Sequence, residues 1–268
     1  MSGIEAENKM LNRTDRGAVA HLEMDAPDSL NALSSAMLAV LMDQFASLAQ
    51  DPQIRVVVIS GAGKAFCAGH DLKEITGARQ AEDAGAAFYA KLFGECGDMM
   101  QAIKALPQVV IAQVHGIATA AGCQLVAGCD LAVADEDTRF GVNGVNIGLF
   151  CSTPMVAVSR NLPRKKVFEM LVTGDFIDAH RACELGLVNR VVPPQSLATE
   201  TAALADQVAG KLGAAVRLGK RAFYEQIEMP VDAAFAHTTK TMVENLLIRD
   251  TQEGIDAFLQ KRDPAWDQ

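Results

Sequence analysis

The sequence has too little positive charge for several classes of partner. Its 24 lysines and arginines are outnumbered by 33 aspartates and glutamates, which gives a formal net charge of −9. Nucleic acids and anionic membrane surfaces require a basic footprint, so we expect neither as the main partner. A small anionic ligand stays compatible with this charge, because a few local lysines are enough to bind one.

Targeting and metal-binding patterns are also lacking. Residues 1–13 (MSGIEAENKMLNR) have no apolar core, which argues against a signal peptide or membrane span and leads us to expect a cytoplasmic protein. The six cysteines are scattered, without a C-x-x-C pair or a neighbouring histidine. We expect reduced, mostly buried thiols and no metal site. The cysteines are Cys67, Cys96, Cys123, Cys129, Cys151 and Cys183.

The most informative stretch is residues 61–74 (GAGKAFCAGHDLKE), which follows the apolar run 55–60 (RVVVIS). The pattern predicts a strand that ends in a glycine-rich loop and then a helix. Asp71 and Glu74 have the spacing of a helix N-cap with a capping box, so the helix is expected to begin just after His70. Backbone N–H groups near His70 are therefore candidate anion donors, although such joints also occur as ordinary scaffolding.

The same strand-loop-helix pattern recurs at residues 109–128, and repeated βα units predict an α/β fold with right-handed crossovers. From residue 164 onward the pattern is almost entirely helical, and we expect this tail to pack on the core or on a neighbouring subunit. The expected strands cover residues 17–24, 55–60, 109–115, 130–134 and 188–192. The main expected helices cover residues 37–49, 78–106, 118–128, 165–171, 180–185, 196–212, 214–225, 233–247 and 251–260.

The two joints, near His70 and near Ala121, can each offer one N–H to a single oxygen. Paired backbone donors of this kind form an oxyanion hole, in which each donor lowers a barrier by roughly 3 to 4 kcal/mol. The small residues 120–122 would let a ligand approach the backbone, or would simply permit close helix packing. A phosphate loop built on residues 61–64 fails on spacing, because Ala65 stands where Ser or Thr should follow the lysine.

Four segments, in this order, resemble the crotonase (enoyl-CoA hydratase/isomerase) superfamily. They are residues 61–74, 116–135 (GIATAAGCQLVAGCDLAVAD), 163–193 (PRKKVFEMLVTGDFIDAHRACELGLVNRVVP) and 253–262 (EGIDAFLQKR). The resemblance implies a spiral of ββα units with a C-terminal helical trimerisation region. It divides the chain into a core at 1–200, which holds the acyl-CoA site, and a helical part at 201–268 for oligomerisation and covering CoA. A homotrimer or a dimer of trimers is expected.

The resemblance also implies the ligand and the residues that hold it. The ligand would be an acyl-CoA thioester, with coenzyme A carried as part of the substrate and no separate cofactor. The oxyanion donors would be the N–H groups of His70 and Ala121. Contacts to CoA would fall on Lys64, Ala68, Lys73 and, from the tail toward an adjacent subunit, Lys261. The alternative is that these lysines are solvated surface charges.

The sequence departs from the family where proton transfer should occur. Hydratases of the family use two glutamates, and the matching positions are Gln124 and Gly144. Neither residue exchanges a proton near neutral pH, and each lost acid-base group typically costs about 100- to 10,000-fold in rate. Gln124, Asn143 and Asn146 can orient a water molecule but cannot take its proton.

On the sequence alone, the other residues that could replace the glutamates in proton transfer are weak candidates. His70 has a suitable pKa, but its side chain is expected to point away from the thioester. The thiols of Cys67, Cys123 and Cys151 have no evident activating partner. Residues 82–83 are expected to be solvated helix charges.

Residues 150–154 (FCSTP) also depart from a glycine-rich turn of typical hydratases. Here Ser152 or Thr153 is expected to cap a helix that begins at Pro154, near the acyl end of the site. The sequence thus predicts an acyl-CoA-acting lyase or isomerase that stabilises a thioester enolate. Hydration is in doubt, whereas isomerisation, decarboxylation and thioester hydrolysis stay open. The alternative is a catalytically silent acyl-CoA binder or scaffold subunit.

Overall fold

A six-stranded sheet forms the centre of the molecule, which the computed structural model describes over residues 10–266. The strand order is β1-β2-β3-β4-β6-β9; β1 and β2 are antiparallel and the other pairs are parallel. The sequence favours these strands because β-branched residues dominate the central ones. The strands are β1 (Leu11–Arg16), β2 (Val19–Met24), β3 (Val56–Gly61), β4 (Val109–Val114), β6 (Leu131–Asp135) and β9 (Arg190–Val192).

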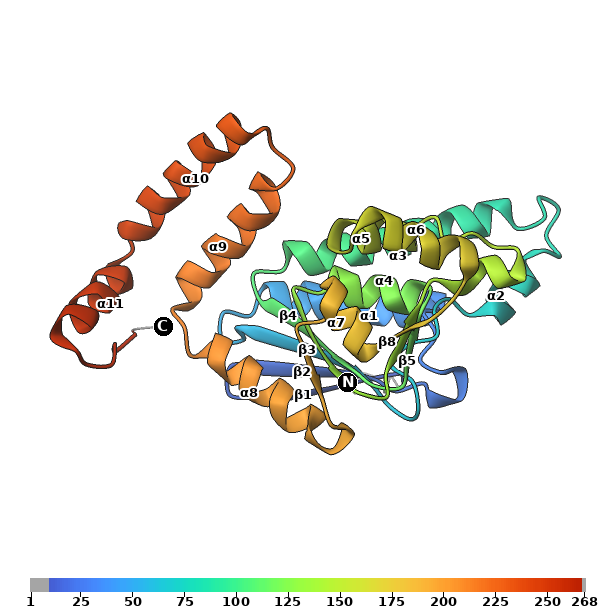
Figure 1. The fold of residues 1–268 in the computed structure, drawn as a ribbon, viewed down its shortest axis with the longest axis horizontal. Helices are drawn as coiled ribbons and strands as arrows, with labels where there is room; N and C mark the ends of the chain where they lie inside the picture. The colour runs from blue at the N-terminus through green and yellow to red at the C-terminus, as the bar shows by residue number, and fades with distance from the viewer. Residues whose placement is uncertain (1–9, 267–268) are drawn as a thin grey trace, which may run out of the picture.

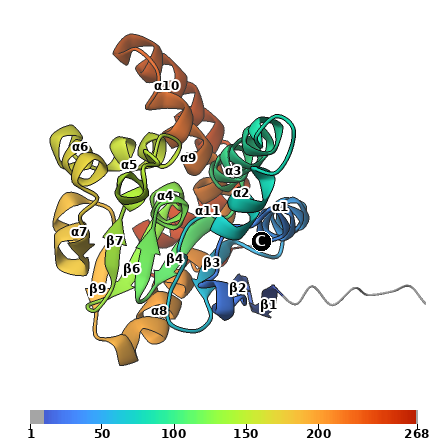
Figure 2. The same ribbon diagram turned by 90° about the vertical axis from the view of Figure 1, so that its right-hand side faces the viewer.

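Helices cover both faces of this sheet, as Figure 2 shows. Strand β3 is buried along its whole length: Val57 and Ile59 pack in the larger core, while Val56 and Val58 pack in a second core with α8. A parallel strand that is buried on both faces has an almost continuous run of apolar residues in its sequence. Residues 55–60 show this pattern. The helices of the larger core are α1 (Ser35–Ala49), α3 (Ala86–Ala105), α4 (Ala121–Gly128), α5 (Pro154–Asn161), α6 (Arg164–Thr173) and α7 (Ala179–Leu185), and α8 is Leu197–Ala209.

A smaller sheet stands beside the first and carries the second strand-loop-helix joint. It consists of β5 (Ile117–Thr119), β7 (Arg139–Gly141) and β8 (Ile177–Asp178), in the order β5-β7-β8. Strand β5 ends directly before α4, and the 3-10 helix η2 (Asn143–Ile147) follows β7. The ends of β5 and β7 therefore lie side by side, because these two strands are parallel.

The last three helices extend away from the body of the molecule (Figure 1). Helix α9 (Gly213–Gln226) contacts α3 and β4, whereas α10 (Val231–Leu246) contacts mainly α9 and α11 (Arg249–Gln260). No residue of α10 is buried. Among the described residues, no helix has the length and hydrophobicity that a membrane crossing requires.

The structure corrects three expectations about elements. Strand β1 was missed because residues 11–16 (LNRTDR) are almost all polar and form an exposed sheet edge. The helix expected at 78–106 begins later, as α3, because residues 79–85 form turns that include Ala84 and Gly85 at positive φ; the helix predicted to begin just after His70 is the separate α2 (Leu72–Ala78). Strand β8 interrupts the region expected to be helical. The division into 1–200 and 201–268 stays a prediction, and its boundary falls inside α8.

Candidate active site

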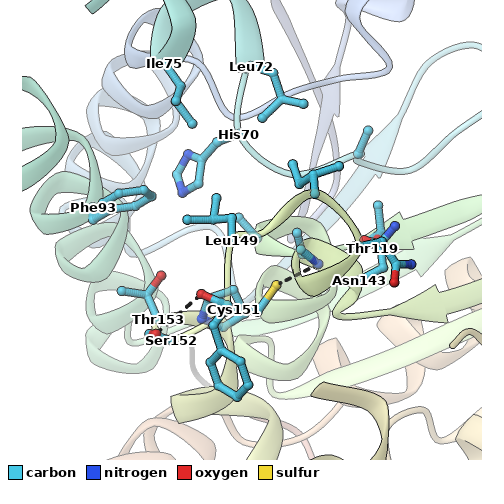
Figure 3. A pocket seen from close by; sticks show the side chains of 18 residues that line it. His70, Leu72, Ile75, Phe93, Thr119, Asn143, Leu149, Cys151, Ser152 and Thr153 are labelled. Carbon is cyan, nitrogen blue, oxygen red and sulfur yellow. Dashed lines mark hydrogen bonds between the residues drawn. The ribbon is translucent and has the colours of Figure 1, made fainter. Parts of the chain in front are cut away.

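A cavity of about 360 Å³ lies between α2, α3, the start of α4, η2 and the segment 149–154 (Figure 3). No lining residue in the described part of the chain carries a carboxylate, an amine or a guanidinium. His70 and Cys151 are the only titratable side chains among these lining residues. The lining residues are Ala68, His70, Leu72, Ile75, Phe93, Thr119, Ala120, Ala121, Asn143, Gly144, Asn146, Ile147, Leu149, Phe150, Cys151, Ser152, Thr153 and Pro154.

Backbone hydrogen bonds join the two predicted donor loops. The N–H of Cys67 donates to the carbonyl of Ile117 at 3.1 Å, and the N–H of Thr119 donates to the carbonyl of Cys67 at 3.0 Å. These bonds bring His70 and Ala121 to the same cavity. Within residues 10–266, neither the N–H of His70 nor that of Ala121 has an acceptor. Two residues that line the cavity thus carry backbone N–H groups without an acceptor in the described chain.

The second loop reaches this geometry through an unusual backbone at Ala120, whose φ is 50° and ψ is −118°. A residue other than glycine held at such angles stores roughly 1–3 kcal/mol of strain, which is typical of functional sites. The neighbouring Gly122 has no room for a side chain, since a Cβ there would overlap the carbonyl oxygen of Cys67. The close approach of the two loops thus requires a glycine at residue 122.

The side chain of His70 lies in the cavity lining, which corrects the expectation that it points elsewhere. Its Nδ1 donates to the carbonyl of Leu33 at 3.0 Å, and its ring meets Phe93 edge-on at 5.2 Å (Figure 3). Nε2 is buried without a hydrogen-bond partner in the described chain, which costs roughly 1–3 kcal/mol. Burial lowers the pKa of His70 from its ordinary 6.5, partly opposed by the Leu33 carbonyl and Glu74.

The donor loop is tied to the start of α1. Leu33 donates its N–H to the carbonyl of Gly69 at 2.8 Å, in addition to accepting from His70. Asp71 caps α2 as predicted, because its carboxylate accepts from the N–H of Lys73 at 2.7 Å. The predicted capping box is wrong: Glu74 accepts instead from the N–H and hydroxyl of Ser35, at 2.9 and 3.1 Å.

Gln124 and Gly144, the two positions predicted to match the family's glutamates, differ in their place in the structure. Gln124 is 4% exposed, lies outside the cavity lining, and has its Oε1 buried without a partner in the described chain. Gly144 lines the cavity, but a Cβ there would overlap the carbonyl oxygen of Leu149 and lie 2.9 Å from the Cys151 sulfur. A side chain at residue 144 would therefore require the backbone at 149 to move.

Two asparagines provide most of the remaining polarity of the cavity. Thr119 donates its hydroxyl to Oδ1 of Asn143 at 2.6 Å. The amide nitrogen of Asn143 is then the group of this side chain that can donate a hydrogen bond to a ligand. Asn146 donates to the carbonyl of Gly174 at 3.3 Å. Amide groups can position a ligand or water but cannot exchange a proton near neutral pH.

The thiols near the cavity are poor nucleophiles. Burial raises the pKa of Cys67 and of Cys123 to about 12, and it also raises the pKa of Cys151. Since the thiolate is the reactive form, these residues act as packing groups. The cysteines were predicted to be free thiols, and the structure agrees with this prediction. Among the described residues, no group of three or more potential ligand side chains is arranged to hold a metal ion.

The segment 150–154 reaches the cavity as predicted but caps its helix differently. Helix α5 begins at Pro154, and Thr153 occupies the N-cap position without a side-chain hydrogen bond. Ser152 donates its hydroxyl to the carbonyl of Phe150 at 3.4 Å instead. The expected side-chain cap is therefore wrong, because Thr153 has helical backbone angles.

The charged residues singled out in the sequence lie outside the cavity lining. Lys64 and Lys73 are exposed near the donor loop, and Lys261 is exposed at the end of α11, far from α2 in Figure 1. Glu82 and Asp83 are exposed, as expected for solvated charges. Hydrogen bonds from the N–H groups of residues 87 and 85 lower the pKa of Asp83, which precedes α3.

A family model described as enoyl-CoA hydratase/isomerase matches residues 14–268 of the chain. The protein belongs to this family. The crystal structure of an enoyl-CoA hydratase from Mycobacterium smegmatis is 52% identical, covers 97% of this chain and 99% of its own, and superposes with a TM-score of 0.92. That of human enoyl-CoA hydratase domain-containing protein 3 is 42% identical, covers 96% and 100%, and has a TM-score of 0.91. The predicted crotonase-like α/β fold is confirmed.

The names of curated relatives correct the predicted location. The rat enoyl-CoA hydratase domain-containing protein 3 is 41% identical over 265 residues, covering 99% of this chain and 87% of its own. It and its mouse, frog, human and zebrafish counterparts are named mitochondrial. The cytoplasmic expectation is therefore wrong. It rested partly on residues 1–9, which lie outside the described residues, and on a composition that suits any aqueous compartment.

Sequence reasoning missed three contributors to the site. Phe93 packs against the imidazole, Thr119 fixes the Asn143 amide, and Leu33 supplies the carbonyl that holds the His70 ring. Thr119 had a usable signal, since it ends a strand immediately before the small residues 120–122. Leu33 had none, because it lies 37 residues from His70 and contributes only backbone atoms.

Proposed function

We propose that this enoyl-CoA hydratase/isomerase family protein binds an acyl-CoA thioester and polarises its carbonyl with the N–H groups of His70 and Ala121. The observation that supports the proposal is that two residues lining one cavity carry backbone N–H groups without an acceptor in the described chain. Preorganised donors of this kind favour the negative oxygen of an enolate over the neutral carbonyl, which is how they accelerate a reaction.

The rest of the cavity supports an acyl ligand. Its lining is mainly apolar, and four large apolar side chains are exposed around it. A thioester with a hydrocarbon chain would cover this surface, while the two amides would hold its one strongly polar atom. The four side chains are Leu72, Ile147, Leu149 and Phe150.

Ordinary hydration is disfavoured by the absence of carboxylates from the lining. Adding water across a double bond needs one group to take a proton from water and a group to supply a proton to carbon. Gln124 and Gly144 supply neither, and Gly144 has no room for a longer side chain. Reactions that form an enolate without a pair of carboxylates, such as isomerisation or decarboxylation, are more compatible with these residues.

Coenzyme A would extend from the cavity past Ala68, with Lys64 and Lys73 close enough in sequence to meet its phosphates. Both lysines are exposed, so their side chains are free to reorient. In a homotrimer or a dimer of trimers, Lys261 of a second copy would complete this contact. The exposed apolar side chains of α10 and α11 support such an assembly, because they are unburied within one chain.

The proposal is tested by incubating the protein with enoyl-CoAs, malonyl-type acyl-CoAs and saturated acyl-CoAs and identifying the products by mass spectrometry. We expect binding of acyl-CoA and turnover that changes the position of a double bond or releases CO₂. Hydration of crotonyl-CoA as the fastest reaction would contradict the assignment.

The alternative function is a silent acyl-CoA binder or scaffold subunit. It is favoured by the same lack of carboxylates in the lining, since a cavity without an acid-base pair still binds thioesters. Binding without product formation from any member of the panel would establish this alternative and exclude enzymatic action on those substrates.

A further inference from the structure

We propose that Asn143 determines the specificity of this site and selects acyl-CoA thioesters that carry a carbonyl oxygen on C3, the 3-oxoacyl class. The inference rests on the proposed function, because it requires the thioester oxygen to be held by the N–H groups of His70 and Ala121. The side-chain amide nitrogen of Asn143 donates a third hydrogen bond, which goes to the oxygen on C3.

Thr119 fixes the orientation of the Asn143 amide. Its hydroxyl lies 2.6 Å from Oδ1 of Asn143, a length that is typical of an O–H···O bond and short for an N–H···O bond. The other acceptor near this hydroxyl is the carbonyl of Gly141 at 3.2 Å, which already accepts from the N–H of Ala120 at 2.9 Å. Oδ1 therefore stays with Thr119, and Nδ2 is the end of the amide that can donate to a ligand.

The amide nitrogen of Asn143 is accessible to a ligand, in contrast to the ring of His70. Within residues 10–266, Nδ2 has no acceptor and is not fully buried, whereas Nε2 of His70 is shielded from solvent. Asn143 is half-buried and lines the cavity. An apolar acyl chain that covered Nδ2 would leave this donor without a partner, which typically weakens binding by a factor of about 5 to 150. An acceptor oxygen on the acyl group removes that cost.

Strand pairing places Asn143 beside the loop of Ala121. Thr119 at the end of β5 is the register partner of Gly141 at the end of β7, and the two strands are parallel. Ala121 and Asn143 each stand two residues beyond these partners, and Figure 3 shows Asn143 next to Thr119. The two donors therefore lie close together. A 3-oxoacyl thioester presents two oxygens close together, because a single carbon separates its carbonyl groups.

A neutral carbonyl oxygen fits this site better than a carboxylate does. The lining residues of the described chain include no lysine or arginine, so a carboxylate buried here would have no counter-charge. A second carbonyl also removes the need for a carboxylate base. It makes the proton on the α-carbon acidic, and this proton is released to water. The C–H electron pair then spreads over both oxygens, one held by the two backbone N–H groups and the other by Asn143.

Comparison of acetoacetyl-CoA with butyryl-CoA tests the inference, because the two ligands differ only at C3. Isothermal titration calorimetry gives both Kd values for the wild type, Asn143→Leu and Asn143→Asp. The leucine has a similar size and no donor, whereas the aspartate keeps an oxygen for Thr119 and replaces Nδ2 by a second oxygen. Asn12→Leu is the matched control, because Asn12 is exposed on β1 and donates to Asp25 at 3.0 Å.

We expect the wild type and Asn12→Leu to bind acetoacetyl-CoA at least about 10-fold more tightly than butyryl-CoA. Both Asn143 variants should reduce this preference at least about fivefold, with little change in the Kd for butyryl-CoA. The near-ultraviolet absorbance of the bound acetoacetyl-CoA enolate should decrease in the same two variants.

Equal wild-type affinities for the two ligands, or an unchanged preference in both Asn143 variants, would overturn the inference and leave acyl-CoA binding intact. Tighter wild-type binding of malonyl-CoA than of acetoacetyl-CoA would also overturn it, because the site would then select a carboxylate. Failure of the wild type to bind any of the three ligands would overturn the proposed function itself.

Discussion

Gly144 lines the cavity but has no room for a side chain. A Cβ at this residue would overlap the carbonyl oxygen of Leu149, so the backbone has closed over the space that a side chain would occupy. Placing a glutamate at this position would therefore mean rebuilding the segment 149–151 as well. The resemblance in sequence predicted a missing carboxylate at this position, whereas the closed space is visible only in three dimensions.

Gly144→Ala is therefore expected to destabilise the fold by about 1–3 kcal/mol, the range for overpacking a closed site. Urea denaturation of the variant gives this value directly. Gly94→Ala in α3 is the control, because its Cβ would have no neighbour within 4 Å and alanine favours a helix. A Gly144→Ala protein as stable as wild type would contradict the steric argument. For the same reason, the double variant with glutamate at residues 124 and 144 is expected not to regain hydratase activity.

His70 also makes the stability of the protein depend on pH. Its folded-state pKa is lowered from 6.5, so near this pH the unfolded chain binds a proton that the folded chain resists. Stability is therefore expected to fall as pH decreases below about 6.5, by at most roughly 1.4 kcal/mol per pH unit for this one group. Urea midpoints measured between pH 5 and 7.5 should show a smaller slope for His70→Asn. Equal slopes in the two proteins would contradict the assignment.

Among the elements, the sequence predicted strands β3 and β4 and helices α2 and α4, but it missed β7 and η2 and placed residues 118–119 of β5 in a helix. Residues 55–60 and 109–115 were recognisable because both faces of these strands are buried and their sequences are continuously apolar. The capping box failed because Glu74 finds its partner in Ser35, 39 residues away. Likewise, the turn at residues 79–85, which replaces the beginning of the helix expected at 78–106, includes Ala84 at a positive φ, for which alanine gives no local signal.

A buried ion pair anchors α9 to the sheet and so attaches the C-terminal helices to the body of the molecule. Lys220 donates to the Asp130 carboxylate at 2.7 Å and to the carbonyls of Ile103 and Gln108, and Tyr224 donates to the other Asp130 oxygen at 2.7 Å. The side chains of Lys220 and Asp130 are 6% and 11% exposed. Removing one partner would leave a charge buried without compensation.

Lys220→Met is accordingly expected to lower the free energy of unfolding by about 3–5 kcal/mol. The neighbouring Arg221→Met offers a matched control, because the Arg221–Glu244 pair is exposed and should contribute about 1 kcal/mol or less. Both values come from chemical denaturation under the same conditions. Similar losses in the two variants would show that the Lys220 contact does not anchor α9.

At the scale of the whole molecule, α10 and α11 present large apolar side chains that a single chain does not cover. Phe235, Leu247 and Phe258 are 71%, 81% and 82% exposed. The sequence resemblance predicted trimerisation for this region, and the chain's own structure supplies the apolar surface that such an interface needs.

Light scattering in solution tests this assembly. We expect the wild type to have the mass of a trimer or a hexamer, and Phe235→Ser combined with Leu247→Ser to reduce that mass by removing apolar contact area. Lys91→Ser, an exposed change on α3, is the control and should leave the mass unchanged. A monomeric wild type would contradict the proposed assembly.

We propose that the N–H groups of His70 and Ala121 polarise a thioester carbonyl in a cavity whose described lining residues carry no carboxylate. Carbon-13 NMR of butyryl-CoA labelled at the thioester carbon measures this polarisation directly. We expect the carbonyl resonance to move downfield when the ligand binds, because two hydrogen bonds to the oxygen withdraw electrons from the carbon. A bound resonance at the position of free butyryl-CoA would contradict it.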